Sequence, residues 1–357
     1  MPPAGRRIFS GNPPLGQLFR QRIQTTENEP EEVVMAEILG LGCSHGPIIL
    51  TPPEVWAKGR ERVFARIPNF RPSGELLEEL GQDNGLTQDR LDHQKVLESF
   101  QVLHDKLHRW NPDVVMIIGD DQQENFKPEN LPPFCIYTGT EVDGYPFQRA
   151  AARTNLWNEP PETRFSFHCP KEFSQQLRNF LIRDGFDISS ASALTGWEWG
   201  LAHAHINPLM FLDREGKFPL LPIFINCYGE EAGPDYPPRP TPSRCYQLGQ
   251  GIRRFLDTRS ERVAVVASSS WSHLFLAHRH QCMAIDLDTD RRLLQYVQQG
   301  HGSKLAELTP EEIQESGDHE ILNWIVALGI IGDRPAEIVD VRESQTQLAY
   351  RIAALWE

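Results

Sequence analysis

The stretch 113-DVVMIIGDD-121 decides the fold class of this chain. It begins with a run of consecutive apolar residues, most of them β-branched, which is typical of a strand buried on both faces of a sheet. Gly119, Asp120 and Asp121 follow directly. In α/β sheets, functional sites gather where strands end and loops begin. The stretch therefore predicts a buried strand followed by a loop that carries a site.

Helices and strands alternate on both sides of this stretch. Residues 88–110 predict a long helix, because apolar side chains recur at helical spacing at Leu91, Val96, Phe100, Leu103 and Leu107. Further helices are expected at 53–66, 171–184, 243–257, 288–299 and 318–329, and further strands at 36–42, 218–228, 262–273 and 336–341. The Pro-rich residues 127–170 predict an irregular covering segment. This order predicts an α/β fold, a single layered domain with a central mixed β-sheet flanked by helices.

Residues 1–34 differ in composition from the rest of the chain. They contain proline and glutamine and end in an acidic segment. We expect a peripheral tail at 1–34, with one short helix near 15–23, and a single domain at 35–357.

The overall composition limits the classes of function. The chain has 357 residues, a formal net charge of −14 and a pI near 5.4. Binding of nucleic acid or of an anionic membrane surface requires clustered lysine and arginine, so neither is expected, whereas a small anionic substrate needs only a few local cations. No apolar run is long enough to span a bilayer. The six cysteines are scattered and no secretory signal is apparent, so we expect a cytoplasmic protein with reduced thiols.

Three strand ends finish in polar residues that could form one site: 40-GLGCSHGP-47, 116-MIIGDDQQENF-126 and 266-VASSSWSHLF-275. His45 and His273 each follow a strand, and imidazole is the commonest ligand of transition metals. Either histidine could equally be hydrogen-bonded in a turn. His203 and His205 lie in 200-GLAHAHINPL-209. Their spacing places them on one face of an extended segment and on different faces of a helix, so spacing alone does not choose between them.

Glu320 opens the segment 320-EILNWIVALG-329, which we interpret as an amphipathic helix. A carboxylate in the first turn usually complements the helix dipole, but it could also turn inward as an anionic metal ligand. Two strand-end histidines and a later glutamate are the ingredients of a two-histidine, one-carboxylate site, which leaves open positions for substrate and O₂.

The order GCSHGP, GDDQQENF, GLAHAHINPL, ASSSWSHLF and HEILNWI resembles the class III extradiol dioxygenases, the family of the protocatechuate 4,5-dioxygenase β subunit. The resemblance covers nearly all of the chain from Ala36 onward, and His273 and Glu320 are 47 residues apart. It implies that His45 and Glu320 bind Fe(II), and that His273 and His203 are the acid–base residues, with His273 as the base and either histidine as the acid.

The chain departs from the family pattern at one metal ligand. Where the family has Asn-Asp-His, this chain has Asp120, Asp121 and Gln122. The resemblance makes Gln122 the third ligand, through its amide oxygen, with Asp120, Asp121 or Glu124 as alternatives. The sequence GDDQ looks like the version found in the gallate and 3-O-methylgallate branch of the family.

The chemistry that the resemblance implies is cleavage of a catechol- or gallate-type ring by O₂. Its expected partners are a small aromatic diol and O₂, without nucleic acid or membrane, in a homo-oligomer. Two alternatives stay open at this point: a metal-free relative that acts as a binding or interaction module, and a zinc hydrolase that uses the same residues. Four residues are expected to contact a flat phenol, although ordinary packing would also explain them: Trp271, Ser272, Asn226 and Phe126.

Overall fold

A computed structural model describes residues 35–149, 152–194, 200–229 and 232–357. The tail expected at 1–34 lies outside the described residues, so that division stays a prediction. The described residues contain an eight-stranded sheet in the order β6-β3-β7-β2-β8-β1-β10-β9. Its strands are β1 (Glu37–Cys43), β2 (Val114–Asp120), β3 (Phe134–Tyr137), β6 (Ser189–Ala191), β7 (Leu220–Ile225), β8 (Arg262–Ser268), β9 (Glu337–Arg342) and β10 (Arg351–Trp356).

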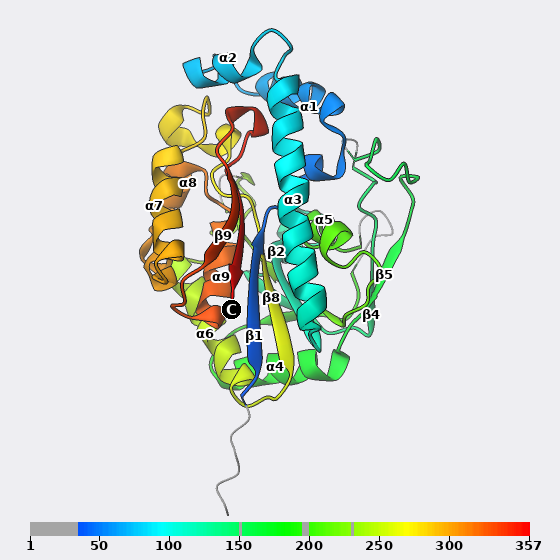
Figure 1. The fold of residues 1–357 in the computed structure, drawn as a ribbon. Coiled ribbons are helices and arrows are strands. Elements are labelled where there is room, and N and C mark those ends of the chain that lie inside the picture. Colours follow the sequence, from blue (N-terminus) through cyan, green and yellow to red (C-terminus); the bar gives the residue numbers. More distant parts are fainter. Residues whose placement is uncertain (1–34, 150–151, 195–199, 230–231) are drawn as a thin grey trace, which may run out of the picture. The chain divides into compact units, whose positions relative to one another are not determined.

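The sheet is mixed, with a parallel centre. Strands β7, β2, β8 and β1 are parallel neighbours, whereas β3 pairs with β7, and β10 with β1, in antiparallel fashion. The carboxyl ends of the four central strands therefore meet at one edge, which lies toward the top of Figure 1 on the side of α1 (Trp56–Phe64) and α2 (Gly74–Leu80). Loops that leave this edge can bring distant residues together.

Helices cover both faces of the sheet, because successive side chains of β2 point to opposite faces and are apolar on both. Val115 and Ile117 pack into one hydrophobic cluster, and Val114, Met116 and Ile118 pack into the other. The first cluster lies under α3 (Leu86–Trp110) and α5 (His203–Leu212); the second lies under α4 (Lys171–Arg183), α6 (Pro242–Leu256), α7 (Leu287–Gln298) and α9 (Ile321–Ile331) (Figure 1). The predicted α/β domain with a central mixed sheet flanked by helices is confirmed.

Several local predictions were wrong. The segment expected to be irregular contains β3, β4 (Glu141–Gly144) and β5 (Phe165–His168), the last two paired in a small separate sheet. Strand β10, α2 and α8 (Pro310–Ser316) were not anticipated. Helix α9 is buried on every side instead of being amphipathic, because it packs between the sheet and α6.

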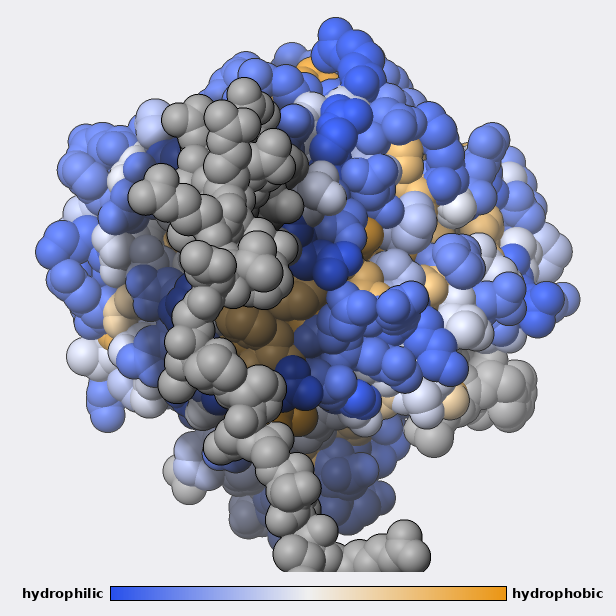
Figure 2. Space-filling model, turned by 90° about the horizontal axis from the view of Figure 1, so that it is seen from below, coloured by the Kyte–Doolittle hydropathy of each residue, from blue (hydrophilic) through white to orange (hydrophobic). Residues whose placement is uncertain are grey.

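The outside of the protein is mostly polar on the face shown in Figure 2, where hydrophilic residues surround smaller groups of apolar ones. Among the described residues, no helix combines the length and the apolar character needed to cross a membrane.

Candidate functional site

Three side chains from separate parts of the chain converge at the carboxyl edge of the parallel strands. His45 follows β1, Asp120 ends β2, and Glu320 directly precedes α9. His45 Nε2 lies 3.1 Å from Glu320 Oε2 and 3.8 Å from Asp120 Oδ1, and one potential ligand atom of each residue lies within 4.8 Å of the others. All three side chains are buried. We call these residues the His-Asp-Glu cluster.

His45 is oriented by its other ring nitrogen. Nδ1 lies 3.1 Å from both the carbonyl oxygen and the hydroxyl of Ser268, and donation to the carbonyl leaves Nε2 to face the two carboxylates. Burial lowers the pKa of His45, but Glu320 and, to a smaller extent, Asp120 outweigh burial and raise this pKa to about 9. Without a metal ion, the imidazole is therefore protonated at neutral pH and itself supplies the positive charge between the carboxylates.

The two carboxylates are held by neutral donors. Asn323 Nδ2 donates to Asp120 Oδ1 at 3.0 Å, and Gln122 Nε2 donates to Asp120 Oδ2 at 3.0 Å and to Glu320 Oε1 at 2.9 Å. Tyr228 also donates its hydroxyl to Glu320 Oε1 at 2.9 Å. Gln122 thus touches both carboxylates of the cluster, and turning its amide over would present the amide oxygen to the same place.

The other two carboxylates of this loop point elsewhere. Asp121 accepts hydrogen bonds from the backbone of Asn125 and Phe126, so it stabilises the turn after β2. Burial, together with the charge of Glu124, raises the pKa of Asp121 to about 6. Glu124 pairs with His203 and Arg149. Of the three alternatives to Gln122, only Asp120 therefore lies in the His-Asp-Glu cluster.

His203 is held in place by Glu124. The carboxylate lies 2.9 Å from His203 Nδ1 and also accepts the backbone N–H of the same residue at 3.1 Å. Burial raises the pKa of Glu124, but His203 and Arg149 outweigh it and lower this pKa to about 2.

Gly200 lies three residues before His203 at a φ of +59°, where a Cβ would lie only 2.0 Å from the carbonyl oxygen of Asp143. Only glycine fits so close to β4, and the contact fixes the approach to α5.

His273 lies on the other side of Glu320. Its Nε2 is 3.9 Å from Glu320 Oε1, and its Nδ1 has no hydrogen-bond partner among the described residues. Burial lowers the pKa of His273, and the nearby Glu320 restores it only in part. A neutral imidazole at neutral pH can accept a proton.

These groups share one cavity of about 550 Å³. Residues of the cluster and its neighbours that line it are His45, Gln122, His203, Tyr228, His273 and Glu320. The opposite wall comes from α1, with Trp56, Gly59 and Val63, and from the segment 346–349 before β10. Buried polar groups that converge on the wall of a partly enclosed cavity are the arrangement expected of a small-molecule site.

Most of the chain matches one known protein family. The family described as the catalytic LigB subunit of aromatic ring-opening dioxygenase matches residues 80–353. The chain belongs to the LigB family. The match includes Asp120, Gln122, His203, His273 and Glu320 but begins after His45, whose position in the site rests on geometry alone.

Curated relatives of this LigB-family chain include two enzymes named 2,3-dihydroxyphenylpropionate/2,3-dihydroxicinnamic acid 1,2-dioxygenase. The one from Photorhabdus laumondii is 25% identical over 179 residues, which are 50% of this chain and 48% of the relative. The one from Pseudomonas putida is 27% identical over 187 residues, 52% of this chain and 51% of the relative. The chain thus spans about half the length of the curated relatives it matches. The crystal structure of an uncharacterized protein from Escherichia coli K12 superposes with a TM-score of 0.47 at 11% identity and covers 89% of this chain and 99% of its own.

The structure separates His203 from His205. Because the segment is helical, the two rings point apart, and His205 Nε2 bonds to the carbonyl oxygen of Ile223 at 3.0 Å while its ring packs on Phe224. Burial lowers the pKa of His205 to about 4. The family resemblance favoured His203, and only His203 lines the cavity.

The four residues expected to contact substrate are not among those that line the cavity. Trp271 packs in the core against Trp324 and Tyr350, and the Ser272 hydroxyl bonds to Asp290. Phe126 packs on Phe224, and the backbone of Asn226 bonds to Pro133. Trp271, Ser272 and Phe126 thus have the ordinary packing roles that the sequence also allowed. The side-chain Nδ2 of Asn226 is buried without a hydrogen-bond partner among the described residues, and Asn226 is not in the cavity lining, so none of the four is retained as a proposed substrate contact.

Three site residues of this LigB-family chain were missed by the sequence argument. Tyr228 ends the strand segment 218–228, where a polar strand end was a usable signal. Asn323 was the one polar side chain within the apolar stretch after Glu320, and a buried amide in such a helix requires a partner. Arg351 opens the unpredicted strand β10 and lines the cavity.

Proposed function

We propose that this chain is a non-haem Fe(II)-dependent extradiol dioxygenase that cleaves the ring of a catechol- or gallate-type diol with O₂. The observation that carries the proposal is the convergence of His45, Asp120 and Glu320 within 4.8 Å, on a cavity that two further histidines line. Family membership supports the ring-opening class, and the curated relatives are named as dioxygenases of dihydroxylated aromatic acids.

The donor set fits a divalent transition metal. One imidazole and two carboxylates give nitrogen and oxygen ligands, which suit Fe(II). Glu320 Oε2 accepts no aligned hydrogen bond among the described residues, although His45 Nε2 lies 3.1 Å away. In the metal-free protein the proton on His45 Nε2 lies between these two atoms, and a cation that displaced this proton would bind both of them. His45 and Glu320 would hold the ion, together with Asp120 or the amide oxygen of Gln122.

The remaining polar groups have proposed roles in proton transfer. When bound, the metal supplies Lewis-acid chemistry that lowers the pKa of a coordinated hydroxyl, and it leaves open positions for substrate and O₂. His273 is the proposed base, because burial keeps it neutral and able to take a proton from the diol. His203 is the proposed acid, held through Nδ1 by Glu124 so that Nε2 is the nitrogen left for substrate.

One observation favours the metal-free alternative. Gln122 Nε2 donates to both carboxylates, and protonated His45 adds a positive charge, so the cluster is already partly neutralised without an ion. In that case the cavity would bind a ligand without chemistry. The two proposals differ in metal content and in oxygen use.

The deciding experiment combines metal analysis with oxygen uptake. Protein purified anaerobically with Fe(II) is expected to hold about one iron per chain and to consume O₂ with catechols, with formation of a yellow ring-fission product. Glu320→Gln keeps the size of the side chain but removes an anionic ligand, so it should lose both iron and turnover while its circular dichroism spectrum stays that of a folded chain. Iron-free protein without oxygen uptake would favour the binding module, and bound zinc with oxygen-independent hydrolysis would favour a hydrolase. A cytoplasmic location and a homo-oligomeric assembly stay predictions.

A further inference from the structure

The cavity that contains the candidate site is cationic although the chain is acidic. Among the described residues that line it, Glu320 is the one carboxylate, whereas five are arginines: Arg60, Arg62, Arg66, Arg149 and Arg351. The whole chain carries a formal net charge of −14. A concentration of positive charge against the sign of the whole protein indicates a local requirement for an anion.

Four of these arginines have ordinary surroundings. Arg60 forms an ion pair with Asp89 and Arg149 forms one with Glu124, so each has a protein carboxylate as counterion. Arg62 and Arg66 belong to the exposed side of the α1 segment, where solvent reaches them. Neither pair distinguishes one ligand from another.

Arg351 is different because it is buried and, among the described residues, forms no ion pair within 4.0 Å. Its side chain is 5% exposed, and Nε and Nη1 have no hydrogen-bond partner among the described residues. Burial lowers the pKa of the guanidinium to about 10, so it stays charged at neutral pH. A buried charge without a partner is costly and is normally paired, which indicates a partner that is not part of the described chain.

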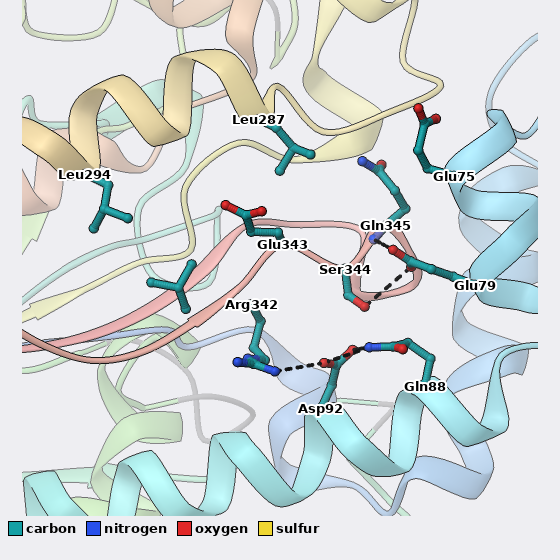
Figure 3. A pocket seen from close by; sticks show the side chains of 11 residues that line it. Glu75, Glu79, Gln88, Asp92, Leu287, Leu294, Arg342, Glu343, Ser344 and Gln345 are labelled. Atoms are coloured by element: carbon teal, nitrogen blue, oxygen red, sulfur yellow. Dashed lines mark hydrogen bonds and ion pairs between the residues drawn. The ribbon is translucent and has the colours of Figure 1, made fainter.

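Asp92 is the carboxylate that acts most strongly on the charge of Arg351, and it already interacts with other side chains. Asp92 lies on α3 between Gln88 and Arg342, as Figure 3 shows. Gln88 Nε2 lies 3.1 Å from both of its oxygens, and Arg342 Nη1 lies 3.8 Å from Oδ1. Arg342 is the direct cross-strand neighbour of Arg351 in the β9–β10 pair. Asp92 acts on Arg351 through its charge alone, since no ion pair or hydrogen bond among the described residues joins the two. The closer counterion of Arg342 is Asp340, at 2.9 Å.

The guanidinium of Arg351 lies beside the candidate metal site. A Cβ added to Gly46 would meet Nη1 at 3.0 Å, so the guanidinium rests on the backbone next to His45. Its positive charge lowers the pKa of His273 and is stabilised by the carboxylate of Glu320. A group bound to Arg351 would thus occupy the same cavity as a diol at the cluster.

We propose that Arg351 is a specificity-determining residue that binds a carboxylate of the aromatic substrate, which makes the substrate an acidic diol. That the bound acid is a substrate rests on the proposed function. The binding of an anion by Arg351 does not depend on turnover. Arginine binds a carboxylate through charge-assisted hydrogen bonds, and the partly enclosed cavity strengthens the attraction.

The test compares ligands that differ only in charge. Calorimetry with metal-free protein measures the affinity of 3,4-dihydroxybenzoate against 3,4-dihydroxybenzamide, and of 3-(2,3-dihydroxyphenyl)propanoate against its amide, so that the two pairs distinguish a ring carboxylate from one on a side chain. The wild type should bind the acid of at least one pair on the order of 10²-fold more tightly than the amide. Arg351→Met should reduce that ratio to near one, and Arg351→Lys should retain part of it, because it keeps the charge and loses the guanidinium.

Arg291→Met is the control, since it removes an exposed arginine that pairs with Glu343 and does not line this cavity. It should leave the acid-to-amide ratio as in the wild type. A ratio near one for both pairs in the wild type would overturn the proposal, as would an unchanged ratio in Arg351→Met. An Arg351→Met chain that fails to fold would show a structural arginine and would also overturn it.

Binding and turnover separate this inference from the proposed function. Arg351-dependent binding of acids without oxygen uptake would refute the dioxygenase and keep the anion site. Equal turnover of acids and amides in the wild type and in Arg351→Met would keep the dioxygenase and refute the anion site.

Discussion

Metal binding at the His-Asp-Glu cluster should be coupled to loss of a proton from His45. In the metal-free protein the pKa of His45 is about 9, because Glu320 and Asp120 stabilise the imidazolium more than burial disfavours it. A metal ion needs the lone pair of Nε2, so the proton and the ion compete for the same atom. The apparent metal affinity should therefore rise with pH and level off only near pH 9.

The size of the effect follows from this pKa. Below pH 9 the apparent affinity should fall about tenfold per pH unit, so at pH 7 it should be about 100-fold below its plateau. A histidine with the ordinary pKa of about 6.5 would already be at its plateau at pH 7.5. Close to one proton should be released for each metal ion bound at pH 7.

The raised pKa of His45 also affects the stability of the metal-free fold. The folded pKa of His45 lies above the unfolded value, so protonation contributes stability that is fully present below about pH 6.5. This contribution is lost as pH rises through about 9, and it amounts to about 3 kcal/mol. Metal affinity and metal-free stability should therefore change in opposite directions between pH 6.5 and pH 9.

The assay is an anaerobic Fe(II) titration against a competing chelator from pH 6 to pH 9.5, with proton release measured by calorimetry in buffers of different ionisation enthalpy. Asp120→Asn removes one of the charges that raise the pKa of His45, so its plateau should begin at lower pH. Asp121→Asn is the matched control, because Asp121 bonds to loop backbone and does not belong to the cluster. An affinity that stays flat from pH 6.5 to pH 9, or binding without proton release at pH 7, would refute this reasoning.

Three further variants test the other roles. Gln122→His should tighten Fe(II) binding in the same chelator competition, because imidazole is a stronger donor to Fe(II) than an amide oxygen; an unchanged affinity would mean that position 122 supplies no ligand. His273→Ala should keep its iron and lose roughly 10²–10⁴-fold in kcat, the usual effect of a lost acid–base group; full activity with iron bound would remove His273 from the mechanism. Glu124→Gln should keep its iron but lower kcat, because the carboxylate that holds His203 through Nδ1 and the backbone N–H is replaced by an amide; an unchanged kcat at unchanged melting temperature would contradict the proposed link between Glu124 and His203.

The central sheet could be predicted because its signals are local. The run after Asp113 is long, apolar and β-branched, and such a run between helical segments has few alternatives to a buried parallel strand. The end of that strand also fixes where polar side chains emerge. For the same reason the strand-end residues His45 and His273 were found without a structure, and both line the cavity.

The parts that could not be predicted depend on contacts between distant segments. Strand β10 is short and begins with Arg351, and it is a strand because β1 and β9 pair with it. The sequence 203-HAHINPLMFL-212 is compatible with a strand or a helix, and packing of α5 on α3 decides for the helix. The roles of Asp120 and Asp121 differ although the residues are adjacent, because successive side chains leave a strand end in different directions.

The loop after β2 lacks the histidine of the family pattern, but Asp120, at the end of that strand, can supply a third donor atom. In this chain Asp120 lies in the cluster, and Gln122 bonds to both of its carboxylates. If an ion is bound, an aspartate in place of a histidine adds one negative charge, which raises the attraction for a divalent cation and equally for the proton on His45. Because the metal ion and the proton compete for His45 Nε2, the occupancy of the site by metal should depend on pH. Asp120 therefore adds to a dependence on pH whose larger part comes from Glu320.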